Sequence, residues 1–178
     1  WTLWRRDTSR DPAEALGRFA SAVIIVELAA MLCTVGEKRG LAQRLAEEPA
    51  EADGGRAPEA VIADGLLLAA ISGVLVALAL WLVPRPMFPS GIYTESDRLM
   101  VLAIPALALT EILLAAQAYR FDIAATVRAR AIVEPWTISI AVGLLYYVVP
   151  DSGLGLAYLL SIYAALLTAL VPYARTYG

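Results

Sequence analysis

The sequence predicts an all-α fold, a multi-pass transmembrane helix bundle with about five spans. Hydrophobic residues make up 60% of the chain and the mean hydropathy is +0.67, whereas soluble domains are roughly 45–50% apolar. The charged residues gather in a few connectors and leave long stretches almost free of charge, which is typical of a polytopic membrane protein. We expect a polar N-terminal segment over residues 1–17 and a helical bundle over residues 18–178.

The first predicted span covers residues 18–35 and carries an acidic residue, Glu27, near its middle. At about 1.5 Å per residue this helix is roughly 27 Å long, which is enough for the hydrocarbon layer. An ionised carboxylate at that depth costs a few kcal/mol, so Glu27 should face protein or water rather than lipid.

The second predicted span covers residues 61–83, with Asp64 in its first turn, where an acidic residue favours the helix dipole. Small residues recur every four positions along this span: Gly65, Ala69, Gly73 and Ala77. Such a stripe lets another helix approach closely, so we interpret it as a packing face.

The third predicted span covers residues 99–118 and contains Pro105 and Glu111. Proline leaves a carbonyl unbonded about one turn earlier and can kink the helix. Glu111 is the second carboxylate that the sequence places inside a span.

The fourth and fifth predicted spans, residues 132–149 and 156–174, are joined by so few residues that they must form an antiparallel hairpin. Pro135 fits either the first turn of the fourth span or a kink in a helix that has already begun. The helix-compatible composition of residues 122–131 favours one continuous helix that starts in the cytoplasm. The fifth span has its own small-residue stripe: Ser161, Ala165 and Ala169.

The distribution of basic residues predicts the orientation. The connectors after the first and third spans hold Lys38, Arg39, Arg44, Arg56, Arg120, Arg128 and Arg130. The connectors on the opposite side hold only Arg85 and Arg98. The positive-inside rule therefore places connectors 36–60 and 119–131 in the cytoplasm. The arginines at positions 5, 6, 10 and 18 then lie on the other side, against the rule.

Several classes of function are excluded by composition. The chain has no histidine, so histidine-based metal sites and catalytic triads are excluded. It also lacks a glycine-rich phosphate loop with a lysine and any basic stripe that would bind nucleic acid. The single cysteine, Cys33, cannot form an intrachain disulfide. We therefore expect no enzymatic activity, no metal and no cofactor.

What remains is a set of charges at membrane depth or at its edge. Glu27 and Glu111 either line a water-filled cavity and couple an ion, or pair structurally with an arginine of a neighbouring helix. Arg130 and Glu134 are four residues apart on one helix face, so a local ion pair is predicted, with a substrate contact as the alternative. Arg120 and Arg128 are interpreted first as topology anchors.

The order of these segments resembles a known family. The first span ends in Thr-Val-Gly-Glu-Lys-Arg-Gly-Leu-Ala-Gln-Arg (residues 34–44), and a loop and two further spans follow. The basic connector then leads through Arg-Ala-Ile-Val-Glu-Pro-Trp-Thr-Ile-Ser (130–139) to a hairpin with Gly-Leu-Gly (153–155). From residue 16 onward the chain resembles the N-terminal part of the bacterial polysaccharide (lipid-linked oligosaccharide) flippases of the multidrug/oligosaccharidyl-lipid/polysaccharide exporter superfamily.

The resemblance implies that the chain is a fragment, matching the second to sixth helices of a transporter with twelve to fourteen. It implies alternating access to a central cationic cavity that accepts the pyrophosphate-linked sugar. The candidate substrate-binding residues are Arg39, Arg44, Arg120, Arg128 and Arg130. The candidate ion-coupling or cavity residues are Glu27, Glu111 and Glu134.

We therefore expect a flippase of the bacterial inner membrane that moves a lipid-linked oligosaccharide in surface polysaccharide biosynthesis. Its expected partners are the anionic lipid-linked glycan, membrane lipids and the polysaccharide assembly machinery. Two alternatives stay open: a multidrug exporter of the same superfamily, which the mid-span carboxylates suit, and a non-transporting membrane scaffold subunit.

Overall fold

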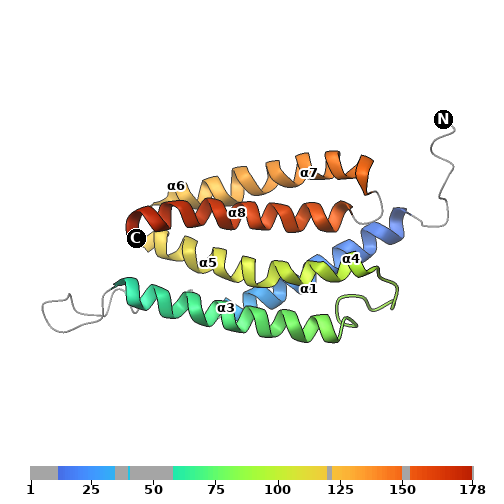
Figure 1. Cartoon of the computed structure of the whole chain (residues 1–178), viewed down its shortest axis with the longest axis horizontal. Coiled ribbons are helices and arrows are strands. Elements are labelled where there is room, and N and C mark those ends of the chain that lie inside the picture. The colour runs from blue at the N-terminus through green and yellow to red at the C-terminus, as the bar shows by residue number, and fades with distance from the viewer. Residues whose placement is uncertain (1–11, 35–39, 41–57, 120–121, 150–152, 178) are drawn as a thin grey trace, which may run out of the picture.

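The computed structural model describes residues 12–34, 40, 58–119, 122–149 and 153–177 of the chain. The described residues are almost entirely helical and contain no strand. The long helices run alternately up and down, side by side, and the start of α1 (Pro12–Thr34) and the end of α8 (Gly153–Tyr177) lie at opposite ends of the bundle (Figure 1). The predicted all-α bundle is confirmed.

The first two long helices are α1 (Pro12–Thr34) and α3 (Pro58–Leu82). Both begin before the predicted spans do. Asp64 consequently lies in the second turn of α3 rather than the first, and Glu59 is the acidic residue of the first turn. Prolines at both helix starts explain the difference, because a proline in the first turn has no N–H to lose and its φ is already helical.

The third helical stretch is built from three segments: α4 (Glu95–Arg98), the 3₁₀ segment η3 (Leu99–Leu102) and α5 (Ala103–Tyr119). Thr94 caps its start, since the Thr94 hydroxyl accepts from the Asp97 N–H and the Asp97 carboxylate accepts from the Thr94 N–H. Pro105 lies in the first turn of α5, directly after the 3₁₀ segment. Its missing N–H therefore falls where the helix type changes.

The fourth stretch is one continuous helical run, as residues 122–131 predicted: α6 (Ile123–Thr126), the π-helical segment η4 (Val127–Val133) and α7 (Glu134–Val148). Pro135 therefore lies inside a helix that has already begun. Its ring would collide with the carbonyl four residues earlier in a regular α-helix. The wider π turn immediately before it relieves that collision. The fifth stretch is α8 (Gly153–Tyr177), which packs antiparallel against α7.

The stripes of small residues are buried, as predicted. Gly65, Ala69, Gly73 and Ala77 lie on the side of α3 that contacts α5. Ser161, Ala165 and Ala169 form the buried face of α8, which contacts α5 and α7. The central helix is the stretch from Glu95 to Tyr119, of whose most apolar window 67% is buried, against 22–33% for the other candidate spans.

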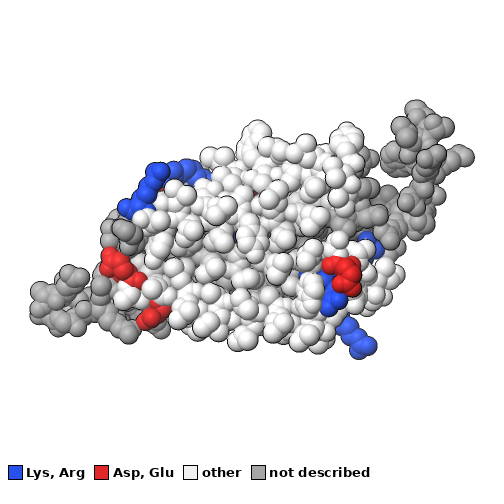
Figure 2. Space-filling view, in the orientation of Figure 1, with Lys and Arg blue, Asp and Glu red and all other residues white. Residues whose placement is uncertain are grey.

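The outside of the bundle is apolar. Large hydrophobic side chains such as Leu67, Ile71 and Leu78 of α3 are at least half exposed. On the visible face, the charged side chains gather at the two ends and leave a white band between them (Figure 2). Among the described residues, four stretches are long and apolar enough to cross a membrane: Ala15–Thr34, Glu59–Leu82, Glu95–Tyr119 and Gly153–Arg175. The protein is a membrane-embedded helical bundle.

The predicted fourth span, 132–149, is not among these four stretches. By itself α7 has 15 residues, or roughly 22 Å, which is short for the hydrocarbon layer. The run reaches membrane-spanning length only together with η4, which brings Arg130 into the bundle.

Candidate functional site

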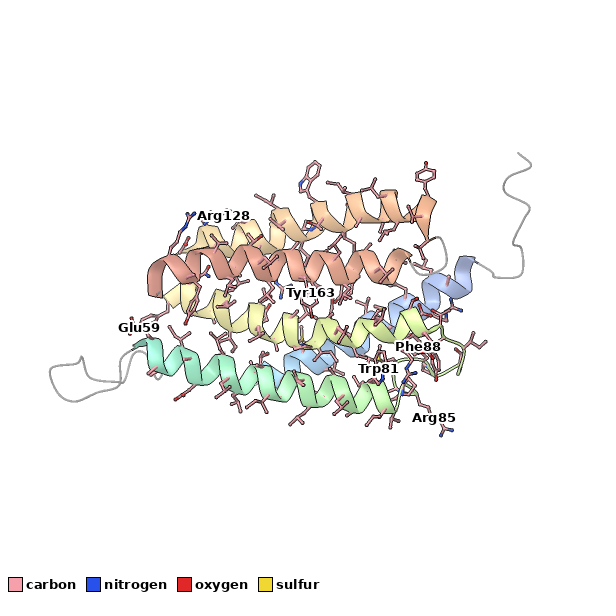
Figure 3. The ribbon with its side chains drawn as sticks, in the orientation of Figure 1. Glu59, Trp81, Arg85, Phe88, Arg128 and Tyr163 are labelled. Carbon is pink, nitrogen blue, oxygen red and sulfur yellow. The ribbon has the colours of Figure 1, made fainter. Side chains whose placement is uncertain are left out.

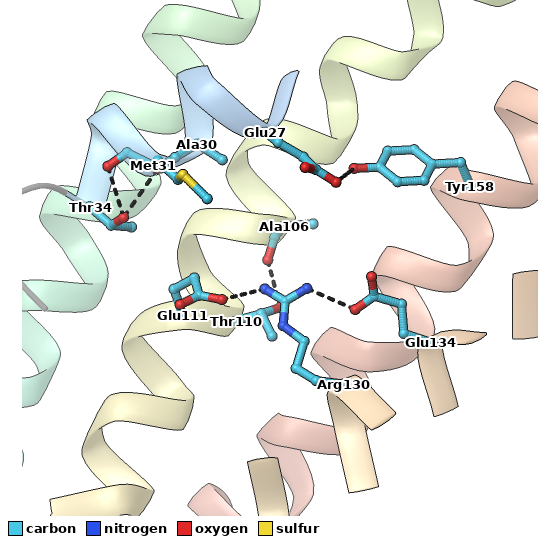
Figure 4. Close-up of polar contacts among 10 residues, drawn as sticks. All are labelled: Glu27, Ala30, Met31, Thr34, Ala106, Thr110, Glu111, Arg130, Glu134 and Tyr158. Carbon is cyan, nitrogen blue, oxygen red and sulfur yellow. Dashed lines mark hydrogen bonds and ion pairs between the residues drawn. The ribbon is translucent and has the colours of Figure 1, made fainter. Parts of the chain in front are cut away.

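A cluster of charged side chains occupies the interior of the bundle (Figure 4). At its centre is Arg130 of η4, which donates from Nη1 to Glu134 Oε2 at 2.7 Å and from Nη2 to Glu111 Oε1. The three side chains are 25–28% exposed. One guanidinium thus bridges carboxylates on α5 and α7.

The two ion pairs have different origins. Arg130 and Glu134 are one turn apart, so their pairing follows from local helix geometry and confirms the prediction. Glu111 comes from α5 and meets Arg130 only because the helices pack together. For Glu111 the structure shows the arginine pairing that the sequence left as one of two interpretations.

This ion-pair network lies at membrane depth. Glu111 is eight residues from the end of α5 at Tyr119, and Arg130 is seven residues after the start of the run at Ile123. At about 1.5 Å per residue both lie roughly 10–12 Å from the nearer helix end. An unpaired charge at that depth is costly, so the mutual pairing is what allows all three groups to remain there.

Glu27 of α1 lies beside Tyr158 of α8 and accepts a hydrogen bond from its hydroxyl at 3.3 Å (Figure 4). Tyr158 is 5% exposed, and its ring and that of Phe19 meet in a T-shaped arrangement at a centroid distance of 6.0 Å. Sequence reasoning missed Tyr158. The sequence does place the Tyr158 hydroxyl inside a predicted span, and a buried tyrosine hydroxyl normally finds a hydrogen-bond partner.

Glu27 itself is exposed in the described part of the chain. A carboxylate at mid-span should not face lipid, so the surface around Glu27 belongs to a water-filled space or to a contact with further protein. Two carboxylates, Glu111 and Glu134, thus hold the Arg130 guanidinium, and a third, Glu27, is held by the Tyr158 hydroxyl.

Arg128 does not belong to this cluster. It lies two residues before Arg130, and side chains at that spacing point to nearly opposite sides of a helix. Arg128 is exposed, its Nε donates to the Ala124 carbonyl at 3.3 Å, and it points away from the bundle near its end (Figure 3). The other predicted substrate-binding residues, Arg39, Arg44 and Arg120, lie outside the described residues.

Arg130 is one of the basic residues from which the sequence predicts a cytoplasmic connector. The structure places it inside the bundle, where two carboxylates pair with it, so it adds no free positive charge to the connector. The helix ends at Pro58, Tyr119 and Ile123 lie at one end of the bundle (Figure 1). The end of α1 lies farther in, because the Cys33 carbonyl accepts from the Ser72 hydroxyl near the middle of α3.

A second group of charges lies at the opposite end. Arg18 is 8% exposed and pairs with Asp97, its Nε lying 3.7 Å from Asp97 Oδ2. Arg98 stacks on the Trp81 ring at 4.6 Å and donates to the Trp81 carbonyl at 2.7 Å. These contacts join α1, α3 and α4 where they leave the apolar band. The pairing with Asp97 also neutralises Arg18, one of the four arginines whose predicted side is against the positive-inside rule.

The site therefore defines a membrane-embedded bundle with ionisable groups inside it. Among the described residues there is no group of three or more histidine, cysteine, aspartate or glutamate side chains that could hold a metal ion. Comparison of the chain with protein-family models, with curated proteins and with solved structures gave no match.

Proposed function

We propose that the chain is part of a membrane transporter that flips a lipid-linked oligosaccharide by alternating access, in surface polysaccharide biosynthesis. The observation that carries this proposal is the charged network at membrane depth. A passive anchor or scaffold has no need of an arginine and three glutamates there. Each such group is costly in hydrocarbon, and charges inside spans commonly mark the route of a substrate or ion.

Arg130 is the residue that we propose for contact with the substrate. Its guanidinium is held by carboxylates on two different helices, α5 and α7. A movement of α7 relative to α5 would separate Arg130 from Glu111 and expose N–H donors. Guanidinium groups bind phosphate oxygens well because their N–H donors match two oxygens at once. The pyrophosphate of a lipid-linked sugar is such a ligand.

The π-helical segment supports this movement. A π turn is a less regular arrangement that occurs frequently at functional sites, and here it carries Arg130 and ends immediately before Glu134 and Pro135. Conversion of η4 to a regular α-helix would rotate α7 relative to α6. Such a rotation changes which side chains of α7 face α5, as alternating access requires.

The test is export in cells that lack the gene and carry the full-length gene with single substitutions. Arg130→Gln should reduce surface polysaccharide at least about tenfold, which corresponds to roughly 1.4 kcal/mol, and leave lipid-linked oligosaccharide on the cytoplasmic leaflet. Glu27→Gln and Glu111→Gln should also lower export. Arg85→Gln, an exposed arginine at the other end of the bundle (Figure 3), is the matched control and should export normally.

Two further measurements keep this test decisive. The amount of each variant in the membrane fraction separates a transport defect from a folding defect. Tyr158→Phe removes only the hydroxyl that Glu27 accepts from and should leave the membrane level unchanged. Full export by Arg130→Gln and Glu27→Gln at a normal membrane level contradicts the assigned site.

A multidrug exporter of the same superfamily is the second candidate, and the excess of carboxylates favours it. Glu27 is exposed and accepts from the neutral hydroxyl of Tyr158, so its carboxylate is accessible to an organic cation. The discriminating measurement is accumulation of a fluorescent organic cation in the same cells. If the gene lowers cation accumulation and leaves glycan export unchanged, the exporter replaces the flippase as the proposal.

A further inference from the structure

A hollow of about 380 Å³ opens on the surface between η4 and α8, away from the charged network. It is lined by Arg128, Thr168, Val171, Pro172 and Arg175. Basic side chains gather over the end of the bundle where α6 begins and α8 ends (Figure 2). The hollow therefore combines two cations with an apolar wall.

The sequence of α8 explains the hollow. Pro172 lies inside the helix and has no N–H for the Thr168 carbonyl, so the regular hydrogen bonding of α8 is interrupted here. Arg175 follows in the last turn. On the facing helix, the bond from Arg128 Nε to the Ala124 carbonyl fixes the direction of the Arg128 side chain. Both arginines are exposed.

The electrostatics of this hollow differ from those of the charged network. Among the described residues no carboxylate pairs with Arg128 or Arg175, whereas Arg130 is bound by two. At the same end, Glu59 and Asp64 belong to α3, and Asp122 caps the start of α6 with its carboxylate accepting from the Ala125 N–H. The acidic side chains visible at this end lie apart from the basic ones (Figure 2). The Thr168 hydroxyl is occupied, because it donates to the Ala164 carbonyl at 2.8 Å.

The hollow also lies at one end of a candidate membrane span, where the headgroups of a surrounding bilayer are expected. The candidate span Gly153–Arg175 ends at one of the two arginines, and its 23 residues measure roughly 35 Å, a little more than the hydrocarbon layer. Val171 and Leu167 of α8 are 52% and 62% exposed on the membrane side of Arg175. A ligand with an anionic head and apolar chains fits both features.

We propose that the hollow between η4 and α8 binds the phosphate of an anionic phospholipid of the surrounding bilayer, with Arg128 and Arg175 as its two ligands. The acyl chains lie along Leu167 and Val171. Basic pockets between transmembrane helices at the membrane surface are suited to anionic headgroups, and each arginine there contributes about 1 kcal/mol. This site is separate from the Arg130 network and does not depend on the proposed transport function.

The experiment is native mass spectrometry of the full-length protein, released from vesicles of phosphatidylglycerol or of phosphatidylcholine. Phosphatidylglycerol should remain bound to the native protein and phosphatidylcholine should not. Arg128→Gln and Arg175→Gln should each lower retention about fivefold, and the double variant roughly twentyfold. Arg128→Lys should retain more lipid than Arg128→Gln, because the positive charge is kept.

The matched control is Arg85→Gln, which changes an exposed arginine of the surface hollow at the opposite end and should leave retention unchanged. The proposal is overturned if the double variant retains lipid like the native protein, or if Arg85→Gln loses as much. Equal retention of the two phospholipids also overturns it. Displacement of phosphatidylglycerol by excess inorganic phosphate would identify a soluble phosphate as the ligand and reject the lipid. Glycan export by the same variants is a separate readout, so failure of this site and failure of the transport proposal can be distinguished.

Discussion

Gly73 of α3 lies directly against Pro105 of α5. A Cβ atom on residue 73 would be 2.8 Å from the Pro105 Cα and 3.2 Å from its Cβ. The ring and backbone of a proline cannot turn aside as a flexible side chain can, so Gly73→Ala should force α3 away from α5. We expect the variant to lose about 1–3 kcal/mol of stability, measured by unfolding of the purified protein in detergent.

The control for this prediction is Gly143→Ala. Gly143 is exposed in α7, and a Cβ built on it meets nothing within 4 Å. Alanine also favours helix over glycine by about 1 kcal/mol. Gly143→Ala should therefore unfold no more readily than the native protein. Equal loss of stability in both variants would show that the close contact at Gly73 is not the cause.

The apolar surface gives a second prediction, on membrane insertion. Ile71 lies at the middle of α3 and Ile92 lies in the connector before α4, and their exposures are similar, 50% and 53%. If α3 faces lipid, Ile71→Asp should cost about 2.5–3.5 kcal/mol of insertion free energy, and Ile92→Asp should cost very little. Insertion of α3 can be measured by glycosylation mapping of tagged connectors. A similar response at the two positions would contradict a lipid-facing α3.

The third prediction concerns stability of the charged network. Arg130→Gln removes the guanidinium that Glu111 and Glu134 share, and breaking a buried pair in this way costs about 3–5 kcal/mol. Because these side chains are roughly a quarter exposed, we expect a smaller loss, about 2–3 kcal/mol. The measurement is thermal unfolding of the purified variants.

The triple variant Glu111→Gln, Arg130→Gln, Glu134→Gln is the informative comparison. It removes the three charges together, so neither carboxylate remains ionised beside the missing guanidinium. Replacement of a whole ion-pair network is often close to neutral in stability, and the triple variant should unfold at a higher temperature than Arg130→Gln alone. If the triple variant unfolds at a lower temperature than Arg130→Gln, the network as a whole stabilises the fold, which contradicts this prediction.

The fourth prediction concerns the capped start of α4. The Thr94 hydroxyl accepts from the Asp97 N–H at 3.2 Å, and Asp97 also pairs with Arg18 of α1. Thr94→Ala should cost about 1 kcal/mol and loosen the connector between α3 and α4, which amide hydrogen exchange over residues 84–98 can detect. Thr94→Ser keeps the hydroxyl and should protect these amides nearly as well as threonine does.

The features that the sequence predicted correctly are local ones. Runs of apolar residues specify membrane-spanning helices because the backbone of a span must satisfy its own hydrogen bonds. The Arg130–Glu134 pair follows from one-turn spacing within a helix, and the buried stripes of α3 and α8 follow from four-residue spacing. The helix starts were less accurate, as Asp64 shows. Charged and proline residues extend a helix beyond its apolar part without changing the hydropathy pattern.

The sequence by itself thus determined the membrane class, the direction of successive helices and the faces along which they pack. Only the tertiary structure decided that Glu111 would share Arg130 with Glu134, that Glu27 would meet Tyr158, and that Arg128 would instead join Arg175 at the bundle surface. The physical reason is distance along the chain. Helical periodicity fixes where a side chain points relative to its own helix, but its partner depends on how separate helices rotate and pack against one another.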